Sequence, residues 1–198
     1  MDRVNRLDKT FFIRDDVTQI AKELLGKVLV TQIDGHFTSG IIFETEAYAG
    51  PIDKASHTYE NKFTRRTQIM FKEGGIAYIY LIYGIHHLFN FVTNVKGIPH
   101  AVLLRGIVPL SGLEVMRKRR NTAKQNGFTL GPGTASQALG ITTALDGEDL
   151  QGDKIWVEDK GIEIAPSSII AKPRIGVDYA DEHAKWLWNF GVSSDFFR

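Results

Sequence analysis

The sequence contains no cysteine among its 198 residues. Without thiols the chain can form neither a disulfide framework nor a thiolate metal site, so we expect an intracellular protein. It also has no apolar run long enough to cross a membrane, and residues 1–6 lack the apolar core of a secretory signal. We therefore expect no membrane partner and a cytoplasmic location, at the nucleoid in a bacterium or in the nucleus in a eukaryote.

The sequence also lacks an excess of charge of either sign. The net charge is +1, from 24 basic and 23 acidic residues, which excludes a strongly basic protein that binds nucleic acid through bulk charge alone. Two local basic clusters remain, Lys62–Arg66 and Arg117–Arg120. Both are candidate phosphate-binding surfaces, although Arg117–Arg120 taken alone is more typical of a solvated helix face.

Short apolar segments alternate with turn residues and indicate an α+β fold. Asp15-Asp16 is typical of a helix N-cap and Gly26 of a helix end, so we expect a helix between them. Asp34-Gly35 between two apolar runs predicts a β-hairpin, and therefore an antiparallel pair. No linker or repeat divides residues 1–198, so we expect one compact domain built on a curved, largely antiparallel sheet with surrounding helices.

Further elements follow from the same signals. They predict strands within residues 76–92, 101–108, 154–157 and 161–164 and a helix over 110–124. The first of these segments is broken at Gly84, where the chain is expected to turn, and the last two would form a second hairpin. Thr134 or Ser136 is expected to cap a short helix that ends at Leu139.

Two carboxylates stand at alternate positions of an apolar strand, at Glu44 and Glu46. Successive strand side chains point to opposite faces, so Glu44, Glu46 and Tyr48 are expected to share a face. Carboxylates are rarely buried without a partner or a task. Glu46 is a candidate general base with Arg105 as its counter-charge, and a buried structural ion pair is the equal alternative. Paired carboxylates of sugar hydrolases flank their bond from different elements, so that interpretation is discounted.

Aromatic residues alternate in the run that precedes Gly84. Tyr78 and Tyr80 are expected on one strand face, where such residues are more often core than ligand platform. Tyr83 stands beside Gly84 at the predicted turn, a poor place for a core residue and a good place for a protruding wedge. A carboxylate that faces these rings could bind a planar, electron-poor group and activate water beside it.

The histidines do not follow a metal-binding pattern. His57, His86, His87 and His100 match none of the zinc spacings, so we expect hydrogen-bonding or surface roles for them. We expect no metal and no cofactor. Gly131–Thr134 lacks the lysine of a phosphate-binding loop and is interpreted as a structural turn.

Taken together, these segments resemble the alkyladenine DNA glycosylases, also called the mammalian-type 3-methyladenine DNA glycosylases. The resemblance covers nearly the whole chain in order, and the combination is specific although each piece alone is weak. The matching segments are Glu44–Pro51, His57, Thr64–Arg66, Met70-Phe71, Tyr78–Gly84, Asn90, Ala101–Arg105, Gly131-Pro132, Gln137–Leu139 and Arg174–Val177.

The resemblance implies a role for each matched residue. Glu46 would activate the water that attacks C1′ of the nucleotide, and Arg105 would help to hold that water. Tyr83 would enter the duplex and fill the gap left by the extruded nucleotide. The pocket for the flipped base would be lined by Tyr48, His57, Tyr80 and Asn90, the last crowding the 2-amino group of guanine. Contacts with the DNA backbone would come from Thr64, Arg65 and Arg66.

The reaction implied is that of a monofunctional DNA glycosylase acting as a monomer on double-stranded DNA. The resemblance implies 3-methyladenine, 7-methylguanine, hypoxanthine and ethenoadenine as substrates. Extrusion of a base from the duplex costs roughly a few kcal/mol, and least for damaged bases. No lysine stands at position 46, so water is the expected nucleophile and the strand is left uncut. Two other classes stay open: a non-catalytic nucleic-acid-binding module that stacks bases on these rings, and a hydrolase of free nucleosides.

Overall fold

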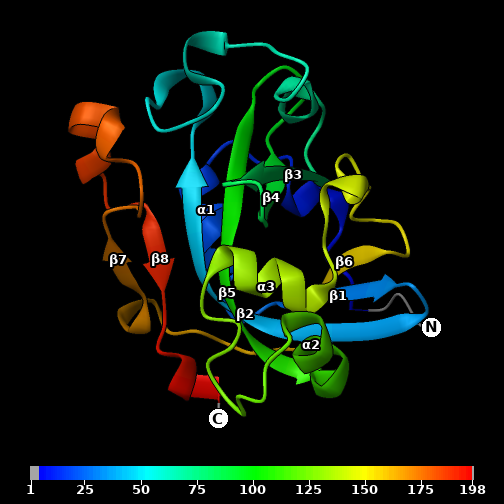
Figure 1. The fold of residues 1–198 in the computed structure, drawn as a ribbon. Coiled ribbons are helices and arrows are strands. Elements are labelled where there is room, and N and C mark those ends of the chain that lie inside the picture. The colour runs from blue at the N-terminus through cyan, green and yellow to red at the C-terminus, as the bar shows by residue number, and fades with distance from the viewer. Residues whose placement is uncertain (1–4, 198) are drawn as a thin grey trace.

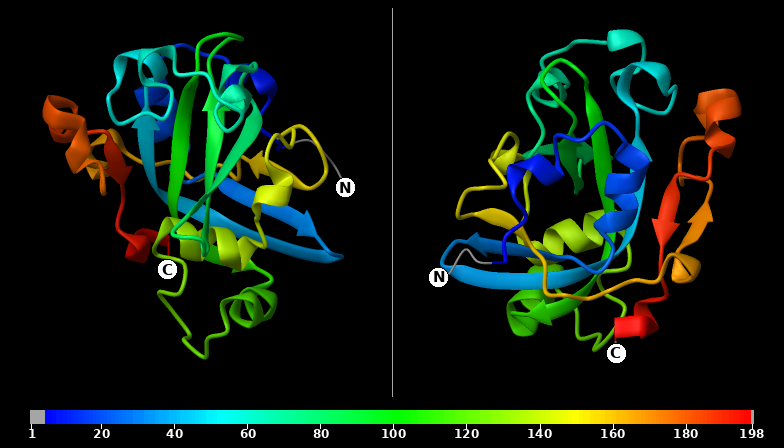
Figure 2. Two further views of the ribbon diagram at one scale, coloured as in Figure 1. Left: turned by 45° about the horizontal axis from the view of Figure 1, so that its top comes forward. Right: turned by 180° about the vertical axis from the view of Figure 1, so that it is seen from behind.

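One antiparallel sheet organises the computed structural model, which describes residues 5–197 (Figure 1). Six strands follow the order β3-β4-β5-β2-β1-β6, and β8 pairs with both β2 and β7. Figures 1 and 2 show that this sheet is strongly curved, as expected for the predicted α+β fold. The strands are β1 (Val28–Ile33), β2 (His36–Tyr48), β3 (Ile76–Ile82), β4 (His86–Thr93), β5 (His100–Ser111), β6 (Ile155–Glu158), β7 (Ile170–Lys172) and β8 (Asn189–Gly191).

Helices cover both sides of the sheet. The helix α1 (Val17–Glu23) packs on β2 and β5 and is seen best from behind in Figure 2, while α3 (Pro132–Leu139) packs on β4 and β5 from the front in Figure 1. The third helix, α2 (Leu113–Arg120), packs against α3. Short 3-10 helices lie at Lys9–Phe11, Gly50–Ile52, Tyr59–Asn61, Gln68–Phe71, Thr143–Leu145, Pro166–Ser168, Asp178–Lys185 and Ser194–Phe197.

The first helix and the first hairpin form where the sequence predicts them. Asp16 caps α1, because its Oδ1 accepts hydrogen bonds from the backbone N–H groups of Thr18 and Gln19 at 2.9 and 3.0 Å. Asp34 and Gly35 take positive φ angles of 52° and 74° between the antiparallel strands β1 and β2. Such φ angles match the twist of a two-residue hairpin, so this turn fixes the register of β2.

Strand β2 carries Glu44 and Glu46 into the middle of the sheet. Over residues 44–46 it pairs with β5 on one side and with β8 on the other. The register against β5 shifts on both sides of Glu44, which marks a bulge-type irregularity. Bulges re-aim side chains and are over-represented near active sites, so this stretch of β2 is a structural candidate for function.

The turn between β3 and β4 projects an aromatic ring into solvent. Tyr83 and Gly84 have φ angles of 54° and 72°, and Tyr83 is 86% exposed. A bulky residue with positive φ is uncommon, and such a backbone costs about 1–3 kcal/mol. The predicted break at Gly84 and the protruding position of Tyr83 are both confirmed.

The predicted cap of α3 is wrong. Gly131 is the N-cap, and the Thr134 hydroxyl reaches back from the third helical position. It accepts from the Gly131 N–H at 3.0 Å and donates to the Gly131 carbonyl at 2.7 Å. Pro132 begins the helix because its fixed φ suits the first position, and Ser136 lies buried inside it.

The predicted second hairpin is also wrong. Strand β6 pairs with β1, and residues 161–164 form no strand. Its partner is distant in sequence, so a local pattern could not identify it. Helix α2 is shorter than the predicted 110–124, because Gly112 and Asn121 on either side of it both take left-handed backbone conformations.

Candidate active site

A cavity of about 810 Å³ opens beside strands β3, β4 and β5 and the loops after β2 and β7. This volume is typical of a site for a small planar ligand. Its wall is rich in aromatic rings and includes two guanidinium groups. The lining residues include Tyr48, His57, Arg66, Tyr78, Tyr80, Tyr83, Asn90, Arg105, Ile175 and Tyr179. The structure therefore brings together the four residues expected to hold a base.

Glu46 is completely buried (0% exposed) and is held by three donors. Its Oε2 accepts a hydrogen bond from the Tyr48 hydroxyl at 2.8 Å. Its Oε1 accepts from the backbone N–H of Ile175 at 2.8 Å and from the Asn189 side-chain amide at 3.1 Å. These bonds come from β2, from the segment after β7 and from β8, so the orientation of the carboxylate is fixed by three parts of the fold.

Glu46 itself does not line the cavity. Tyr48, Arg105 and Ile175 do, and all three contact the carboxylate. The carboxylate thus lies one side chain behind the cavity surface. The hydroxyl of Tyr48 is the group that joins Oε2 to that surface.

Arg105 supplies positive charge to both carboxylates of β2. Its Nε lies 3.6 Å from Oε1 of Glu44 and 3.6 Å from Oε1 of Glu46. Both distances exceed hydrogen-bond length, and this buried Nε–H has no hydrogen-bond acceptor within residues 5–197. The predicted pairing of Arg105 with Glu46 is therefore present as an ion pair, which Arg105 shares with Glu44.

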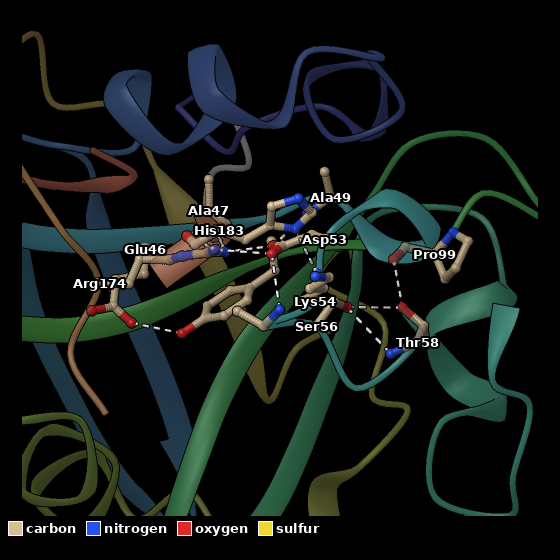
Figure 3. A network of polar contacts seen from close by, with 12 residues as sticks. Glu46, Ala47, Ala49, Asp53, Lys54, Ser56, Thr58, Pro99, Arg174 and His183 are labelled. Carbon is tan, nitrogen blue, oxygen red and sulfur yellow. Dashed lines mark hydrogen bonds and ion pairs between the residues drawn. The ribbon is translucent and has the colours of Figure 1, made fainter. Parts of the chain in front are cut away.

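A buried ion pair supports the cavity wall behind Tyr48. Asp53 and Arg174 are paired with both side chains fully buried, and Nη2 of Arg174 donates to Oδ1 of Asp53 at 2.8 Å. Arg174 also donates to the carbonyls of Ala47 and His183 at 2.9 and 3.2 Å (Figure 3). Its guanidinium carbon lies 4.8 Å from the centre of the Tyr48 ring, a cation–π geometry. The pair ties the end of β2 to the C-terminal segment.

Three tyrosines of the cavity, Tyr48, Tyr78 and Tyr80, keep their protons at neutral pH. Burial, and then the neighbouring Glu46 carboxylate, raise the pKa of Tyr48 well above its usual range. Burial also raises the pKa of Tyr78 and of Tyr80. The phenol of Tyr48 therefore acts as a hydrogen-bond donor to Glu46 at neutral pH.

Aromatic rings form one continuous wall. The ring centres of Tyr78 and Tyr80 are 5.5 Å apart, and His57 meets Tyr80 edge-on at 4.7 Å. The Arg66 guanidinium lies 4.7 Å from the Tyr80 ring centre, and its Nε donates to the Tyr78 hydroxyl at 3.2 Å. Such a wall offers flat, electron-rich faces to a planar cation.

His57 is a neutral imidazole in this site. Its Nδ1 lies 3.0 Å from the Tyr78 hydroxyl. Burial, and then the charges of Arg66 and Lys62, lower the pKa of His57 to about 4. At neutral pH it can offer or accept a hydrogen bond but carries no ready proton for an acid.

Asn90 is fixed in the cavity floor by the backbone of its hairpin. Its Nδ2 donates to the carbonyl of Tyr78 at 3.1 Å and to that of Leu88 at 3.4 Å. The residue is buried and lines the cavity. A side chain held in this way can restrict the shape of what enters.

Three residues of the cluster Lys62–Arg66 lie in three different environments. Arg65 is exposed to solvent, as a phosphate contact requires. The Thr64 hydroxyl instead closes a local turn, accepting from the N–H of Thr67 at 3.1 Å. Arg66 turns back across His57 and the cavity tyrosines, at the mouth of the cavity.

The second basic cluster is used in part by the fold itself. Arg119 donates to the carbonyls of Ile33 and Ala138, both at 3.3 Å. Arg120 donates to the carbonyl of Phe128 at 3.2 Å. Two of the four cations of Arg117–Arg120 therefore bind backbone carbonyl groups. The cluster as a whole is neither a fully solvated helix face nor a surface free to bind phosphates.

Four groups around the carboxylate had no role assigned from the sequence: Asp53, Arg174, Asn189 and the N–H of Ile175. Arg174 and Ile175 belong to the segment Arg174–Val177, on which the family resemblance partly rests. That resemblance was the one signal in the sequence that could have pointed to them. Asp53 is distant in sequence from its partner Arg174, and Asn189 is distant from Glu46, so no spacing in the sequence connects either pair.

Two negative findings concern residues 5–197. No cluster of three or more histidine, aspartate or glutamate side chains there could hold a metal ion. No helix in the same range is long and apolar enough to cross a membrane.

Comparison with known proteins places this site in a family. The family model described as "Methylpurine-DNA glycosylase (MPG)" matches residues 10–195. A protein of Chlamydia felis named "Putative 3-methyladenine DNA glycosylase" is 47% identical over 186 residues, covering 93% of this chain and 94% of its own. Proteins of the same name in Chlamydia abortus and Natranaerobius thermophilus are 47% and 42% identical, over 93% and 97% of this chain and 96% and 98% of theirs.

The aromatic cavity beside a fixed carboxylate is the site of an enzyme with a planar ligand, and the sequence matches name the kind of enzyme. The chain belongs to the methylpurine-DNA glycosylase family. It is a DNA glycosylase, a hydrolase acting on N-glycosyl bonds, with DNA as its substrate. The resemblance stated from the sequence is confirmed, and the interpretation as a non-catalytic nucleic-acid-binding module is not supported.

Proposed function

We propose that this protein is a monofunctional glycosylase that removes alkylated purines, 3-methyladenine first among them, from double-stranded DNA. The observation that carries the proposal is the Glu46 carboxylate, held by three donors against the wall of a cavity lined with tyrosines. The names of its relatives support 3-methyladenine as a substrate.

The aromatic wall favours cationic purines. Tyr48 and Tyr80 line the cavity, and a planar cation between such rings gains about 0.5–2 kcal/mol. Alkylation at N3 or N7 also weakens the glycosidic bond, so the base leaves as a neutral purine without further protonation. 3-Methyladenine and 7-methylguanine are therefore the substrates that need least from the enzyme.

Neutral lesions depend on hydrogen bonding. Hypoxanthine and ethenoadenine carry no charge, and the pKa of His57, lowered to about 4, leaves it unable to act as a standing acid at neutral pH. A neutral His57 can still hydrogen-bond an acceptor on such a base. We propose that these lesions are slower substrates than the cationic ones.

The target nucleotide must leave the duplex to reach this cavity. Tyr83 is exposed on the tight turn between β3 and β4 and lines the rim of the cavity. We propose that it enters the duplex as the base enters the cavity, and so prevents the base from returning. Arg65 and the exposed part of the Lys62–Arg66 cluster would bind nearby phosphates.

Glu46 is the proposed general base. When the purine enters, the Tyr48 hydroxyl would release its hydrogen bond to Oε2 of Glu46. A water molecule, which Arg105 helps to hold, would then donate to Oε2 in its place. Glu46 takes a proton from this water, the water oxygen bonds to C1′, and the C1′–N bond breaks with its electron pair leaving on the purine. No lysine occupies this position, so no Schiff base forms and the DNA strand stays intact.

One chain supplies every part of the proposed site. Residues 1–198 would act as one glycosylase domain and as a monomer, because the cavity, the carboxylate and the wedge all come from the same chain. The protein would be found where the cell keeps its DNA. The reaction would use no metal and no cofactor.

A base-release assay tests the proposal. Duplexes that each carry one 3-methyladenine, 7-methylguanine, hypoxanthine or ethenoadenine are incubated with the protein and then divided, one half being heated in alkali. We expect strand breaks only after alkali, fastest with the cationic bases. Breaks without alkali would contradict the water mechanism, and intact strands in both halves would contradict the proposed function.

A further inference from the structure

A second, smaller cavity lies next to the same carboxylates. Its volume is about 260 Å³, and its lining includes Glu44, Lys172, Ile175 and Asn189. Ile175 also lines the large cavity, so the two spaces adjoin at this residue. Glu44, with a side chain 20% exposed, is therefore in reach of solvent where Glu46 is not.

One amide and one guanidinium connect the two carboxylates. Asn189 Nδ2 donates to Oε1 of Glu44 at 2.8 Å and to Oε1 of Glu46 at 3.1 Å. Arg105 Nε is 3.6 Å from the same two oxygens. Two negative groups thus share one donor and one cation, and the cluster carries one negative charge more than its cation balances.

The other groups that face the pair do not change this balance. Tyr48, Tyr80 and Tyr179 face Glu46 with phenols whose pKa is raised, chiefly by burial, so they stay uncharged. Arg174 is paired with Asp53 in full burial. Lys172 lines the second cavity and is exposed to solvent, which screens its charge.

We propose that Glu44 is a positioning residue for the reaction, acting on Glu46 through Asn189 and Arg105. The inference rests on the proposed function of Glu46 as the base. A second negative charge close by makes proton uptake by a carboxylate more favourable. When Glu46 takes the proton from water, one negative charge remains on Glu44 and balances Arg105.

The Glu44→Gln variant separates this role from a structural one. Glutamine has the same shape and keeps an oxygen that accepts from Asn189, so a purely structural Glu44 predicts an unchanged pH dependence. Our proposal predicts that the acid midpoint of the single-turnover base-release rate moves down by about one pH unit. It also predicts a rate at neutral pH that is about 3- to 10-fold lower, because Glu46 becomes a weaker base.

Two matched variants complete the experiment, with thermal unfolding recorded for each. Glu44→Asp keeps the charge and should retain the wild-type acid midpoint, even where shortening lowers the rate. Glu163→Gln removes an equal charge from an exposed loop and should leave both midpoint and rate unchanged. A Glu44→Gln profile that overlays the wild type, or an equal shift in Glu163→Gln, overturns the inference. Absence of release by the wild type on all four lesion duplexes would instead reject the proposed function.

Discussion

The two ends of the cavity are built in opposite ways. Behind the wall at one end, Glu46 is fully buried and its oxygens accept hydrogen bonds from Tyr48, Ile175 and Asn189. At the other end, Tyr83 stands in solvent on a turn with a positive φ angle. A general base must be oriented to within a fraction of an ångström, whereas a wedge must adapt to the duplex it enters. The packing and the hydrogen bonds of the fold are therefore concentrated around the carboxylate.

Removing the buried charge at position 46 should have the largest effect. Glu46→Gln keeps the shape of the side chain but cannot accept a proton from water, so we expect base release to fall by about 10²–10⁴-fold. Binding of the lesion duplex should stay within a few-fold of wild type. Single-turnover release and fluorescence anisotropy measure the two quantities. Retained excision would reject Glu46 as the base.

Breaking the ion pair behind Tyr48 should affect stability most. Arg174→Met leaves Asp53 buried and unpaired, and we expect the free energy of unfolding to fall by about 3–5 kcal/mol. Denaturant unfolding measures this value. Lys154→Met is the control, because it removes an exposed pair with Glu148 and should change stability little. Equal effects of the two variants would show that the buried pair has no special role.

His57 should give the molecule a pH-dependent stability. Its folded pKa of about 4 lies below the ordinary value of 6.5, so the unfolded chain binds more protons between these values. Stability therefore falls as pH drops from about 6.5 to 4. Over this pH range, the free energy of unfolding of His57→Gln should fall by about 2 kcal/mol less than that of the wild type. Thermal unfolding against pH checks this, with the exposed His36→Gln as control. Parallel curves for wild type and His57→Gln would contradict the account.

Changing the exposed end should have the smallest effect. Tyr83→Ala should weaken capture of the flipped base about tenfold while leaving thermal stability nearly unchanged, because the ring is in solvent. Fluorescence of a 2-aminopurine beside the lesion reports the capture. Ile85→Ala, also exposed near this turn, serves as the matched control and should behave as wild type. An unchanged signal in Tyr83→Ala would remove the wedge from the mechanism.

The sequence predicted those features that depend on local periodicity. The alternation at Glu44, Glu46 and Tyr48 placed three side chains on one face, and Gly84 beside Tyr83 located the turn. Asp16 and the Asp34-Gly35 pair were recognisable because capping and hairpin geometry depend on a few adjacent residues.

Features that depend on distant chain segments could not be predicted. Asn189 reaches Glu46 only because β8 pairs with β2, and Asp53 meets Arg174 only after the C-terminal segment folds over the end of β2. Strand β6 pairs with β1 rather than with its sequence neighbour for the same reason. The N-cap of α3 could not be predicted either, because Gly131 has no side chain that could mark it as a cap.

The most direct test of the account is the structure of the Glu46→Gln variant bound to a duplex with a single damaged purine. We predict an everted purine inside the aromatic cavity, between Tyr48 and the Tyr80–His57 wall, with Tyr83 in the space that the base has left. A purine that remains stacked in the duplex, or that lies in another cavity, would contradict the account.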